Sequence, residues 1–259
     1  MIPKIIHYCW FGDNSIPEKY QKYIDSWKKY CPDYEIRLWN EENYDFTRNQ
    51  YAYEAYNSKQ WAFVSDYARL DIIYKYGGIY LDTDVELIKP IDELVNEGGF
   101  ICFQNPIEVT TGLGFGAEAG NSCIKAMLDI YNDRKFINED GSFNRIPCPA
   151  ANTVGLLDLG LKIDNPWCKD IQYLKGIRVL PEDYFNPLNR DKLTLHITHN
   201  TVAIHHYAAS WNTKFSKGKR IIKLLIPNWY LNNRTKRIAL NDIKKIKMEI
   251  TNSRMNKII

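Results

Sequence analysis

The chain has 259 residues, of which 45% are hydrophobic and 25% charged, and its formal net charge is +3. This length suits one α/β domain with a sizeable core, either alone or with a small appendage. The sequence shows neither the apolar segment of a signal peptide nor an apolar run of about 18 residues, so we expect neither a secreted nor a membrane-spanning protein.

The first elements of the chain predict a strand, a helix and a second strand. Ile2 to Trp10 is apolar and rich in strand-forming residues, and a loop follows it. Pro17 to Tyr30 carries apolar residues at helical spacing, with proline suited to the first turn. Tyr34 to Trp39 alternates between polar and apolar residues. The loop after the first strand is expected at the sheet edge where α/β folds bind nucleotides.

Residues 62–86, AFVSDYARLDIIYKYGGIYLDTDVE, form the segment around which the other elements are placed. Helical spacing of apolar residues predicts a helix from Ala62 to Tyr76, and two glycines follow where a helix ends and the chain reverses. The short apolar run Ile79 to Leu81 predicts a buried strand. Asp82 and Asp84 then lie at the end of that strand, and a period of two points them the same way.

This pair of carboxylates predicts a metal site. Side by side, Asp82 and Asp84 repel each other unless a cation joins them. Mg²⁺ or Mn²⁺ bound by one or two carboxylates keeps positions open for water and substrate phosphates. Asp66 and Arg69 lie three residues apart on one face of the preceding helix. The sequence therefore predicts a nucleotide-handling site.

The later elements are predicted from shorter patterns. We expect helices over Asn49–Asn57, Ile91–Val95 and Asn121–Tyr131, and strands over Gly99–Gln104, Ile177–Leu180 and Thr201–Tyr207. Residues 134–152 are rich in Asn, Asp, Gly and Pro and predict an irregular loop on the acceptor side. The glycines of residues 112–117 either let the backbone approach a sugar or an acceptor, or form a flexible turn at a strand edge.

The string SDYARLDIIYKYGGIYLDTDVE resembles the DXD sugar-binding segment of glycosyltransferase family 32, and it is distantly similar to the large clostridial glucosylating toxins. The resemblance implies a GT-A-like α/β fold: a single Rossmann-type nucleotide-sugar-binding domain with a mixed central sheet, over residues 1–213. It also implies a nucleoside diphosphate sugar as donor, bound through Mn²⁺ or Mg²⁺, and transfer with retention of anomeric configuration.

The resemblance also assigns roles to residues of this chain. Trp10 becomes the ring that stacks on the base, although a core tryptophan at a strand end is the alternative. Asp66 and Arg69 become the pair that contacts the sugar, although such a pair is often only a surface salt bridge. Asp84 becomes the main metal ligand, and Asp82 reaches the ribose or a metal-bound water.

A second motif lies towards the end of the chain. Residues 205–211, HHYAASW, resemble the family pattern H-H-W-x-x-S-W, with Tyr207 in place of the first tryptophan. His206 is the predicted extra metal ligand, or the residue that orients one. Because Mn²⁺ accepts imidazole more readily than Mg²⁺, a histidine ligand favours manganese. Strand register decides whether His205 or His206 points inward. Ser210 and Trp211 are predicted to close over the diphosphate.

Residues 214–259 form a basic helical tail. They contain thirteen Lys or Arg residues against Asp242 and Glu249, with Trp and Leu interleaved. Such a segment can lie on an anionic membrane, so we expect peripheral membrane contact, with a solvated, partly disordered tail as the alternative. No nucleic-acid recognition module accompanies the charge, and we expect no nucleic-acid partner.

The six cysteines, Cys9, Cys31, Cys102, Cys123, Cys148 and Cys168, show no C-x-x-C pair or zinc-like spacing. We expect free, mostly buried thiols in a reducing compartment and hence a cytoplasmic protein, attached at most to the inner face of the cell membrane.

The predicted function is metal-dependent transfer of a hexose or N-acetylhexosamine from a nucleotide-sugar, with uridine as the expected base. The expected acceptor is a glycan or lipid-linked oligosaccharide in capsule, O-antigen or other surface polysaccharide synthesis. One alternative is a phosphatase with D-x-D-x-[TV], but Glu86 stands where that motif has Thr or Val. The other is a non-catalytic module that only binds sugar-nucleotides.

Overall fold

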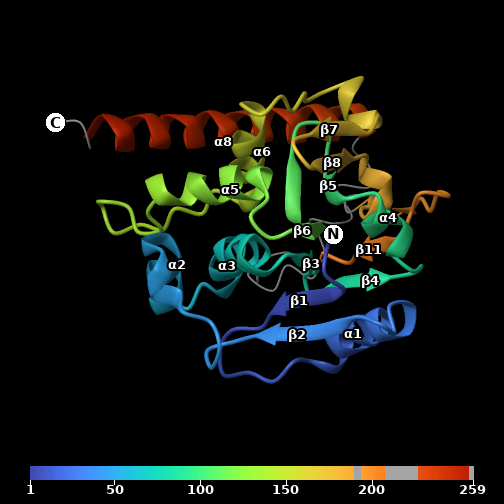
Figure 1. Cartoon of the computed structure of the whole chain (residues 1–259). Coiled ribbons are helices and arrows are strands. Elements are labelled where there is room, and N and C mark those ends of the chain that lie inside the picture. The colour runs from blue at the N-terminus through green and yellow to red at the C-terminus, as the bar shows by residue number, and fades with distance from the viewer. Residues whose placement is uncertain (190–193, 208–226, 257–259) are drawn as a thin grey trace.

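The computed structural model describes residues 1–189, 194–207 and 227–256 (Figure 1). A seven-stranded sheet runs through its centre in the order β2-β1-β3-β6-β5-β8-β7. β1, β2 and β3 are parallel, whereas β6 runs antiparallel to both of its neighbours, β3 and β5. The strands are β1 (Ile5–Cys9), β2 (Glu35–Trp39), β3 (Gly78–Tyr80), β5 (Gly99–Phe103), β6 (Val109–Ala117), β7 (Gln172–Leu174) and β8 (Ile177–Leu180). The predicted α/β class with a mixed central sheet is confirmed.

Helices cover both faces of this sheet (Figure 1). They are α1 (Glu18–Tyr30), α2 (Gln50–Asn57), α3 (Trp61–Tyr76), α4 (Asp92–Asn96), α5 (Ser122–Asp129), α6 (Cys148–Leu157) and α8 (Asn228–Asn256), with short 3₁₀ turns at Phe46–Arg48 (η1), Ile130–Asp133 (η2), Trp167–Lys169 (η3) and Glu182–Tyr184 (η4). One hydrophobic cluster joins the sheet to α2, α3, α5, α6 and α8, and a second joins it to α1 and α4. Neighbouring residues of β3 point to opposite faces of the sheet, so Tyr80 belongs to the first cluster and Ile79 to the second.

The turn between α3 and β3 is fixed by its two glycines and by a buried histidine. Gly77 and Gly78 have φ of 65° and 99°, and a Cβ on Gly78 would lie 2.8 Å from the carbonyl oxygen of Ile5. Trp39 donates from Nε1 to Nδ1 of His7 at 3.0 Å, so the proton lies on His7 Nε2, which donates to the carbonyl of Gly77. Burial lowers the pKa of His7 to about 4 and keeps the ring neutral. The predicted helix end is confirmed.

A smaller sheet brings a distant part of the chain beside the end of β3. β4 (Val85–Leu87) pairs antiparallel with β11 (Ala203–His205), and His205 lies opposite Val85. A second pair of short strands, β9 (Leu188–Asn189) and β10 (Thr194–Leu195), is also antiparallel. The strand expected over residues 201–207 is therefore real but shorter, and its partner β4 lies just after the two aspartates.

Two segments differ from the sequence interpretation. The glycines of residues 112–117 lie inside β6, in the interior of the sheet, so the alternative of a flexible turn at a strand edge is wrong. A Cβ on Gly116 would meet the Phe100 ring at 2.9 Å, which explains glycine in a central strand. The last five residues of the expected 134–152 loop, 148–152, belong to helix α6, which begins at Cys148 after Pro147.

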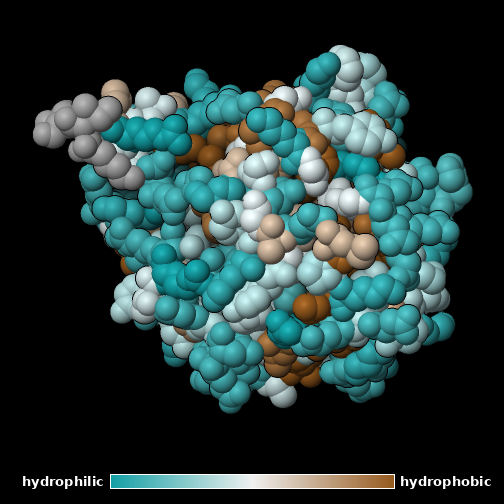
Figure 2. All heavy atoms as spheres, viewed as in Figure 1, coloured by the Kyte–Doolittle hydropathy of each residue, from teal (hydrophilic) through white to brown (hydrophobic). Residues whose placement is uncertain are grey.

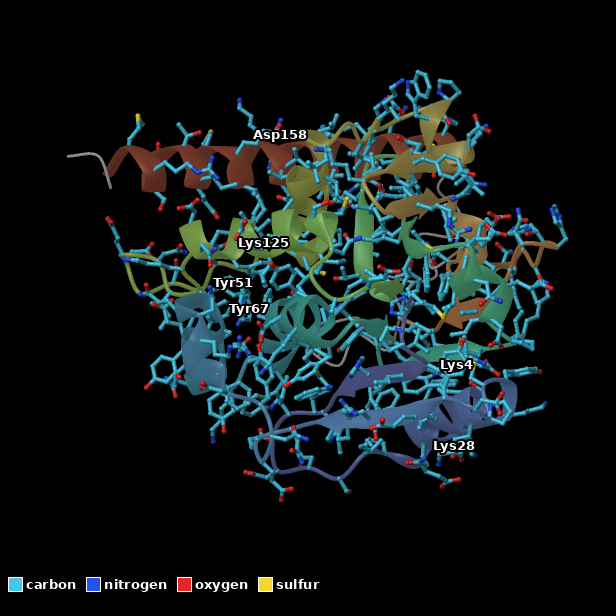
Figure 3. The ribbon with its side chains drawn as sticks, viewed as in Figure 1. Lys4, Lys28, Tyr51, Tyr67, Lys125 and Asp158 are labelled. Carbon is cyan, nitrogen blue, oxygen red and sulfur yellow. The ribbon has the colours of Figure 1, made fainter. Side chains whose placement is uncertain are left out.

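Aromatic side chains fill the helical layer on one side of the sheet. The Tyr131 ring lies 5.0 Å from that of Tyr51 and 5.8 Å from that of Tyr67, both with edge-to-face geometry. Figure 3 shows Tyr51 and Tyr67 between α2, α3 and α5. All six cysteines are free and buried, as the sequence predicts.

The C-terminal helix α8 packs against the rest of the molecule. It extends beyond the helical stretch expected near residues 234–250, and the buried residues Ala239, Ile243, Ile246 and Ile250 belong to the larger core cluster. A solvated, disordered segment is therefore wrong for residues 228–256. The domain boundary expected at residues 213 and 214 lies outside the described residues and stays a prediction. No helix in the described part of the chain is long and apolar enough to cross a membrane.

Removing apolar atoms from the inner side of α8 should destabilise the whole domain. We expect Ile246→Ala to lower the free energy of unfolding by about 2–5 kcal/mol, because it leaves a cavity under a fully buried side chain. The control Met248→Ala removes a side chain that is 52% exposed and should change stability by less than about 0.5 kcal/mol. Urea denaturation measures both; equal losses would show that α8 is not docked through its inner side.

Candidate active site

Asp82 and Asp84 lie in the connection between β3 and β4. β3 ends at Tyr80, and the backbone N–H of Val85 donates to the carbonyl of Asp82 at 3.0 Å, which closes a turn. The prediction that strand periodicity aligns these aspartates is therefore wrong, because neither residue is in a strand. The turn nevertheless brings their carboxylates together with His205, and one ligand atom of each lies within 4.8 Å of the others.

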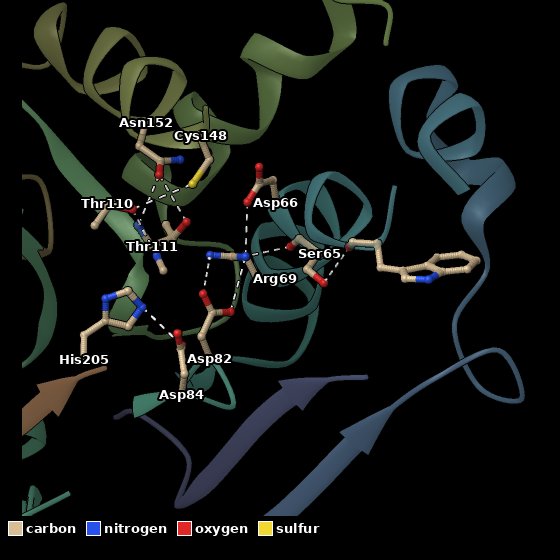
Figure 4. A network of polar contacts seen from close by, with 12 residues as sticks. Ser65, Asp66, Arg69, Asp82, Asp84, Thr110, Thr111, Cys148, Asn152 and His205 are labelled. Carbon is tan, nitrogen blue, oxygen red and sulfur yellow. Dashed lines mark hydrogen bonds and ion pairs between the residues drawn. The ribbon is translucent and has the colours of Figure 1, made fainter. Parts of the chain in front are cut away.

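Arg69 connects the carboxylates of Asp66 and Asp82 (Figure 4). Its Nη2 lies 3.1 Å from Asp66 Oδ1 and 3.3 Å from Asp82 Oδ1, while Nη1 donates to Asp82 Oδ2 at 3.3 Å. Nε donates to the carbonyl of Ser65 at 2.9 Å. The Arg69 side chain is 4% exposed and that of Asp66 is 11% exposed. The surface salt bridge considered as an alternative is therefore wrong, and the predicted pairing on one face of the helix is confirmed.

The site concentrates negative charge in a poorly solvated place. Burial raises the pKa of Asp82 to about 6; Arg69 acts against this shift, and the neighbouring Asp84 adds to it. Burial also raises the pKa of Asp66, with Arg69 again opposing the change. Burial acts to lower the pKa of Arg69, but Asp82 and Asp66 outweigh it and raise this pKa, so the guanidinium keeps its charge. The guanidinium of Arg69 thus pairs with two carboxylates, with Asp84 close to them, an arrangement that a bound cation would complete.

His205 provides the nitrogen atom of this cluster. Its Nε2 lies 3.2 Å from Asp84 Oδ1, and its side chain is 13% exposed. The ring packs edge-to-face on Tyr207, with the centroids 4.3 Å apart, and the Tyr207 hydroxyl donates to Asn186 Oδ1 at 2.7 Å. Tyr207 thereby helps to orient His205.

The selection of His206 as the extra ligand is corrected by the contacts of its side chain. His206 Nε2 lies 2.8 Å from Glu86 Oε2, and its ring stacks on that of Tyr23 at a centroid distance of 4.4 Å. β11 ends at His205, and the backbone N–H of His206 donates to the carbonyl of Asp84 at 2.9 Å while its ring contacts Glu86 and Tyr23. The structure places His205 beside the aspartates.

β6 contributes a close backbone approach that the sequence indicated only in general terms. A Cβ on Gly112 would lie 3.1 Å from both Arg69 Nη1 and Asp82 Oδ2. The glycine therefore admits the ion pair against β6, whereas the sequence suggested an approach to sugar or acceptor. Next to it, Thr111 donates from its backbone N–H to Asn152 Oδ1 at 3.1 Å, which connects β6 to α6 (Figure 4).

The remaining predicted site residues are Trp10, Ser210 and Trp211. Trp10 directly follows β1, is only partly buried, and donates from Nε1 to the carbonyl of Asn14 at 2.6 Å. The alternative of a core tryptophan is therefore wrong, while the stacking role stays a prediction. Ser210 and Trp211 lie outside the described residues.

The donor set suits a divalent metal. Asp82, Asp84 and His205 offer two carboxylates and one imidazole, a mixture that Mn²⁺ accepts and Mg²⁺ binds less readily. Because the ligands would come from the β3–β4 connection and from β11, the small sheet holds both parts of the set together. These residues fit a metal ion on the grounds of atom type and spacing.

Comparison with known proteins relates this site to sugar transfer. Residues 17–101 match a family described as a glycosyltransferase sugar-binding region containing a DXD motif. The chain is 36% identical over 123 residues to inositol phosphoceramide mannosyltransferase 3 of Schizosaccharomyces pombe, a match covering 44% of this chain and 33% of the relative. Inositol phosphoceramide mannosyltransferase 1 of the same yeast is 32% identical over 111 residues, with 39% and 33% covered.

These matches cover parts of the proteins only. The matched segments span about a third of the length of the two mannosyltransferases. Among solved structures, the PaToxG glycosyltransferase is similar with a TM-score of 0.48 and 18% identity, over 61% of this chain and 69% of the other. The family match includes the two aspartates, Asp66 and Arg69, but not His205.

Removing the guanidinium of Arg69 should destabilise the folded protein. We expect Arg69→Met to lower the free energy of unfolding by about 3–5 kcal/mol, because it leaves Asp66 and Asp82 without their cation. The same change at Arg37, whose pair with Glu35 lies at the surface, should cost less than about 1 kcal/mol. Denaturant titrations at pH 7 give both values, and similar losses would contradict the role assigned to Arg69.

Proposed function

We propose that the protein is a metal-dependent glycosyltransferase that uses a nucleoside diphosphate sugar as donor. The observation that carries the proposal is the cluster of Asp82, Asp84 and His205, supported from behind by Arg69 and Asp66. Carboxylates at the edge where parallel β1 and β3 end suit a metal that also takes phosphate oxygens. The match of residues 17–101 to a glycosyltransferase sugar-binding region supports the same reaction.

The charged residues of the site are assigned separate roles. Asp84 and His205, with Asp82, would hold Mn²⁺ or Mg²⁺, which supplies Lewis-acid stabilisation of the departing diphosphate when bound. Arg69 holds both oxygens of Asp82 and so fixes the connection between β3 and β4. Asp66 is assigned the sugar hydroxyls together with Arg69, and Trp10 the base.

The donor and acceptor follow from the relatives and from the sequence. Two relatives are named as inositol phosphoceramide mannosyltransferases, which supports a hexosyl donor and a lipid-borne acceptor for this chain. The proposal retains uridine as the base, transfer with retention of configuration, and a surface polysaccharide such as capsule or O-antigen as the product. Same-face attack through an oxocarbenium-like state is compatible with retention and requires no protein nucleophile.

The phosphatase alternative is disfavoured by the motif and by the comparisons. Residues 17–101, which include both aspartates, match a glycosyltransferase sugar-binding region. Glu86, at the position of the phosphatase motif's Thr or Val, lies beside His206. A module that only binds sugar-nucleotides shares the proposed site, so turnover of the donor distinguishes it from an enzyme.

Asp84→Asn tests the proposal most simply. We expect the variant to lose the rise in melting temperature that Mn²⁺ and UDP-sugars produce together in the wild type, because ligand binding stabilises by mass action. We also expect donor hydrolysis and transfer to fall at least about a hundredfold, since a bound metal supplies several kcal/mol. Asp170→Asn, at an exposed carboxylate, is the control. Wild-type turnover by Asp84→Asn would refute the metal assignment, and binding without turnover in the wild type would favour the sensor.

Metal affinity should depend on pH in a range set by the raised pKa of Asp82. Below about pH 6 this carboxyl is protonated in the metal-free protein and must lose its proton before it can ligate. We expect Mn²⁺ affinity to fall by up to about tenfold per unit as pH drops below 6. Calorimetry with Mn²⁺ at a series of pH values measures the affinity. A decline that begins only near the ordinary aspartate pKa of about 4 would contradict the assignment.

A further inference from the structure

We propose that the outer face of α8 binds peripherally to an anionic lipid bilayer. The outer face is the side turned away from the core, formed by Tyr230, Arg237, Leu240, Lys244, Met248 and Met255 with Lys247 at its edge. The proposal rests on the surface of this helix and not on sugar transfer, so either can fail without the other.

Helix geometry places these side chains together. They recur at intervals of three, four or seven residues, which align on one side of a helix. The opposite side carries the buried Ile243, Ile246 and Ile250, which pack into the core. The apolar side of α8 packs into the core, so it cannot insert into a bilayer. Only the outer face of the helix can contact a membrane.

Large apolar side chains on the outer face are exposed to solvent. Leu240 is 42% exposed, and Met248 and Met255 are each 52% exposed. Leu240, Lys244, Lys247 and Met248 lie next to one another on the open surface of the helix. Figure 2 shows hydrophobic residues beside hydrophilic ones along the upper edge, where α8 crosses the view. Apolar groups between lysines suit the headgroup layer of a bilayer.

The two acidic side chains of α8 do not contribute negative charge to the outer face. Glu249 accepts from the buried Arg134 at 3.0 Å and from Asn144 at 3.1 Å, so it faces the core side. The side chain of Asp242 is 16% exposed and pairs with Lys245. Among the described residues, none forms an ion pair with Arg237, Lys244 or Lys247. The outer face is therefore cationic, although the helix as a whole contains both signs.

The neighbouring sequence has the same sign. Residues 214–226 contain five Lys or Arg residues and no acid, and they precede α8 directly. Each basic residue near an anionic bilayer adds to the attraction. A nucleic acid would satisfy the cations but would leave Leu240 and Met248 in water, so a bilayer explains both features of the face.

Flotation of the full chain with lipid vesicles tests the proposal. We expect the wild type to float with vesicles of phosphatidylcholine and phosphatidylglycerol but not with phosphatidylcholine alone. Lys244→Glu/Lys247→Glu should weaken partitioning at least about tenfold, by loss of attraction and gain of repulsion. Leu240→Ser/Met248→Ser should weaken it severalfold while leaving the charge unchanged. Both pairs lie at the surface, so the melting temperature should stay within a few degrees of wild type.

The control is Lys19→Glu/Lys29→Glu, the same charge change on the exposed side of α1. It should reduce flotation by less than about twofold if α8 makes the contact. Equal losses in the control and the α8 variant, or no loss in either, would overturn the proposal. Failure of the wild type to float would also overturn the proposal. So would tight binding of single-stranded RNA that is lost in Lys244→Glu/Lys247→Glu but kept in the control variant.

Discussion

The buried pairing of Arg69 with Asp66 and Asp82 is the interaction on which the rest of the site depends. Charged groups removed from water are tolerated only when they are paired and hydrogen-bonded. Arg69 meets this condition with two carboxylates and the carbonyl of Ser65, and its guanidinium lies over the ring of Tyr80, 5.1 Å from the centroid. Asp84 and His205 then add a further carboxylate and an imidazole at the same place, where a cation and a diphosphate would balance the charge.

The fold supplies this pairing with fixed positions from four separate parts of the chain. The glycine turn between α3 and β3, which His7 contacts, fixes the position of β3 relative to α3. It therefore also fixes the position of Asp82 relative to Arg69. β6 approaches closely because Gly112 has no side chain, and β11 brings His205 beside β4. α6 extends from this network towards α8, against which it packs. The C-terminal helix is thus a structural part of the domain on its inner side, whatever its outer face contacts.

The sequence predicted the elements that local pattern determines, and it failed where long-range pairing decides. The 62–86 segment combines helical spacing, a glycine stop and an apolar run, and its helix, turn and strand are as expected. The strand β6 was not expected, because its glycines weaken a strand signal and only its neighbours show why they are needed. The sequence selected His206, whereas His205 lies beside Asp84, because the position of β11 depends on its pairing with β4 more than a hundred residues earlier. Asp82 and Asp84 were expected at a strand end, whereas they lie in the connection between β3 and β4.

The most direct test of the account is anomalous diffraction at the manganese edge from crystals grown with Mn²⁺ and a UDP-sugar. The charge argument predicts a single strong peak within coordination distance, about 2.0–2.3 Å, of a carboxylate oxygen of Asp84 and of Nε2 of His205, with the diphosphate on its open side. A peak beside His206 and Glu86, or no peak near the Asp82 to Asp84 turn with donor bound, would contradict it.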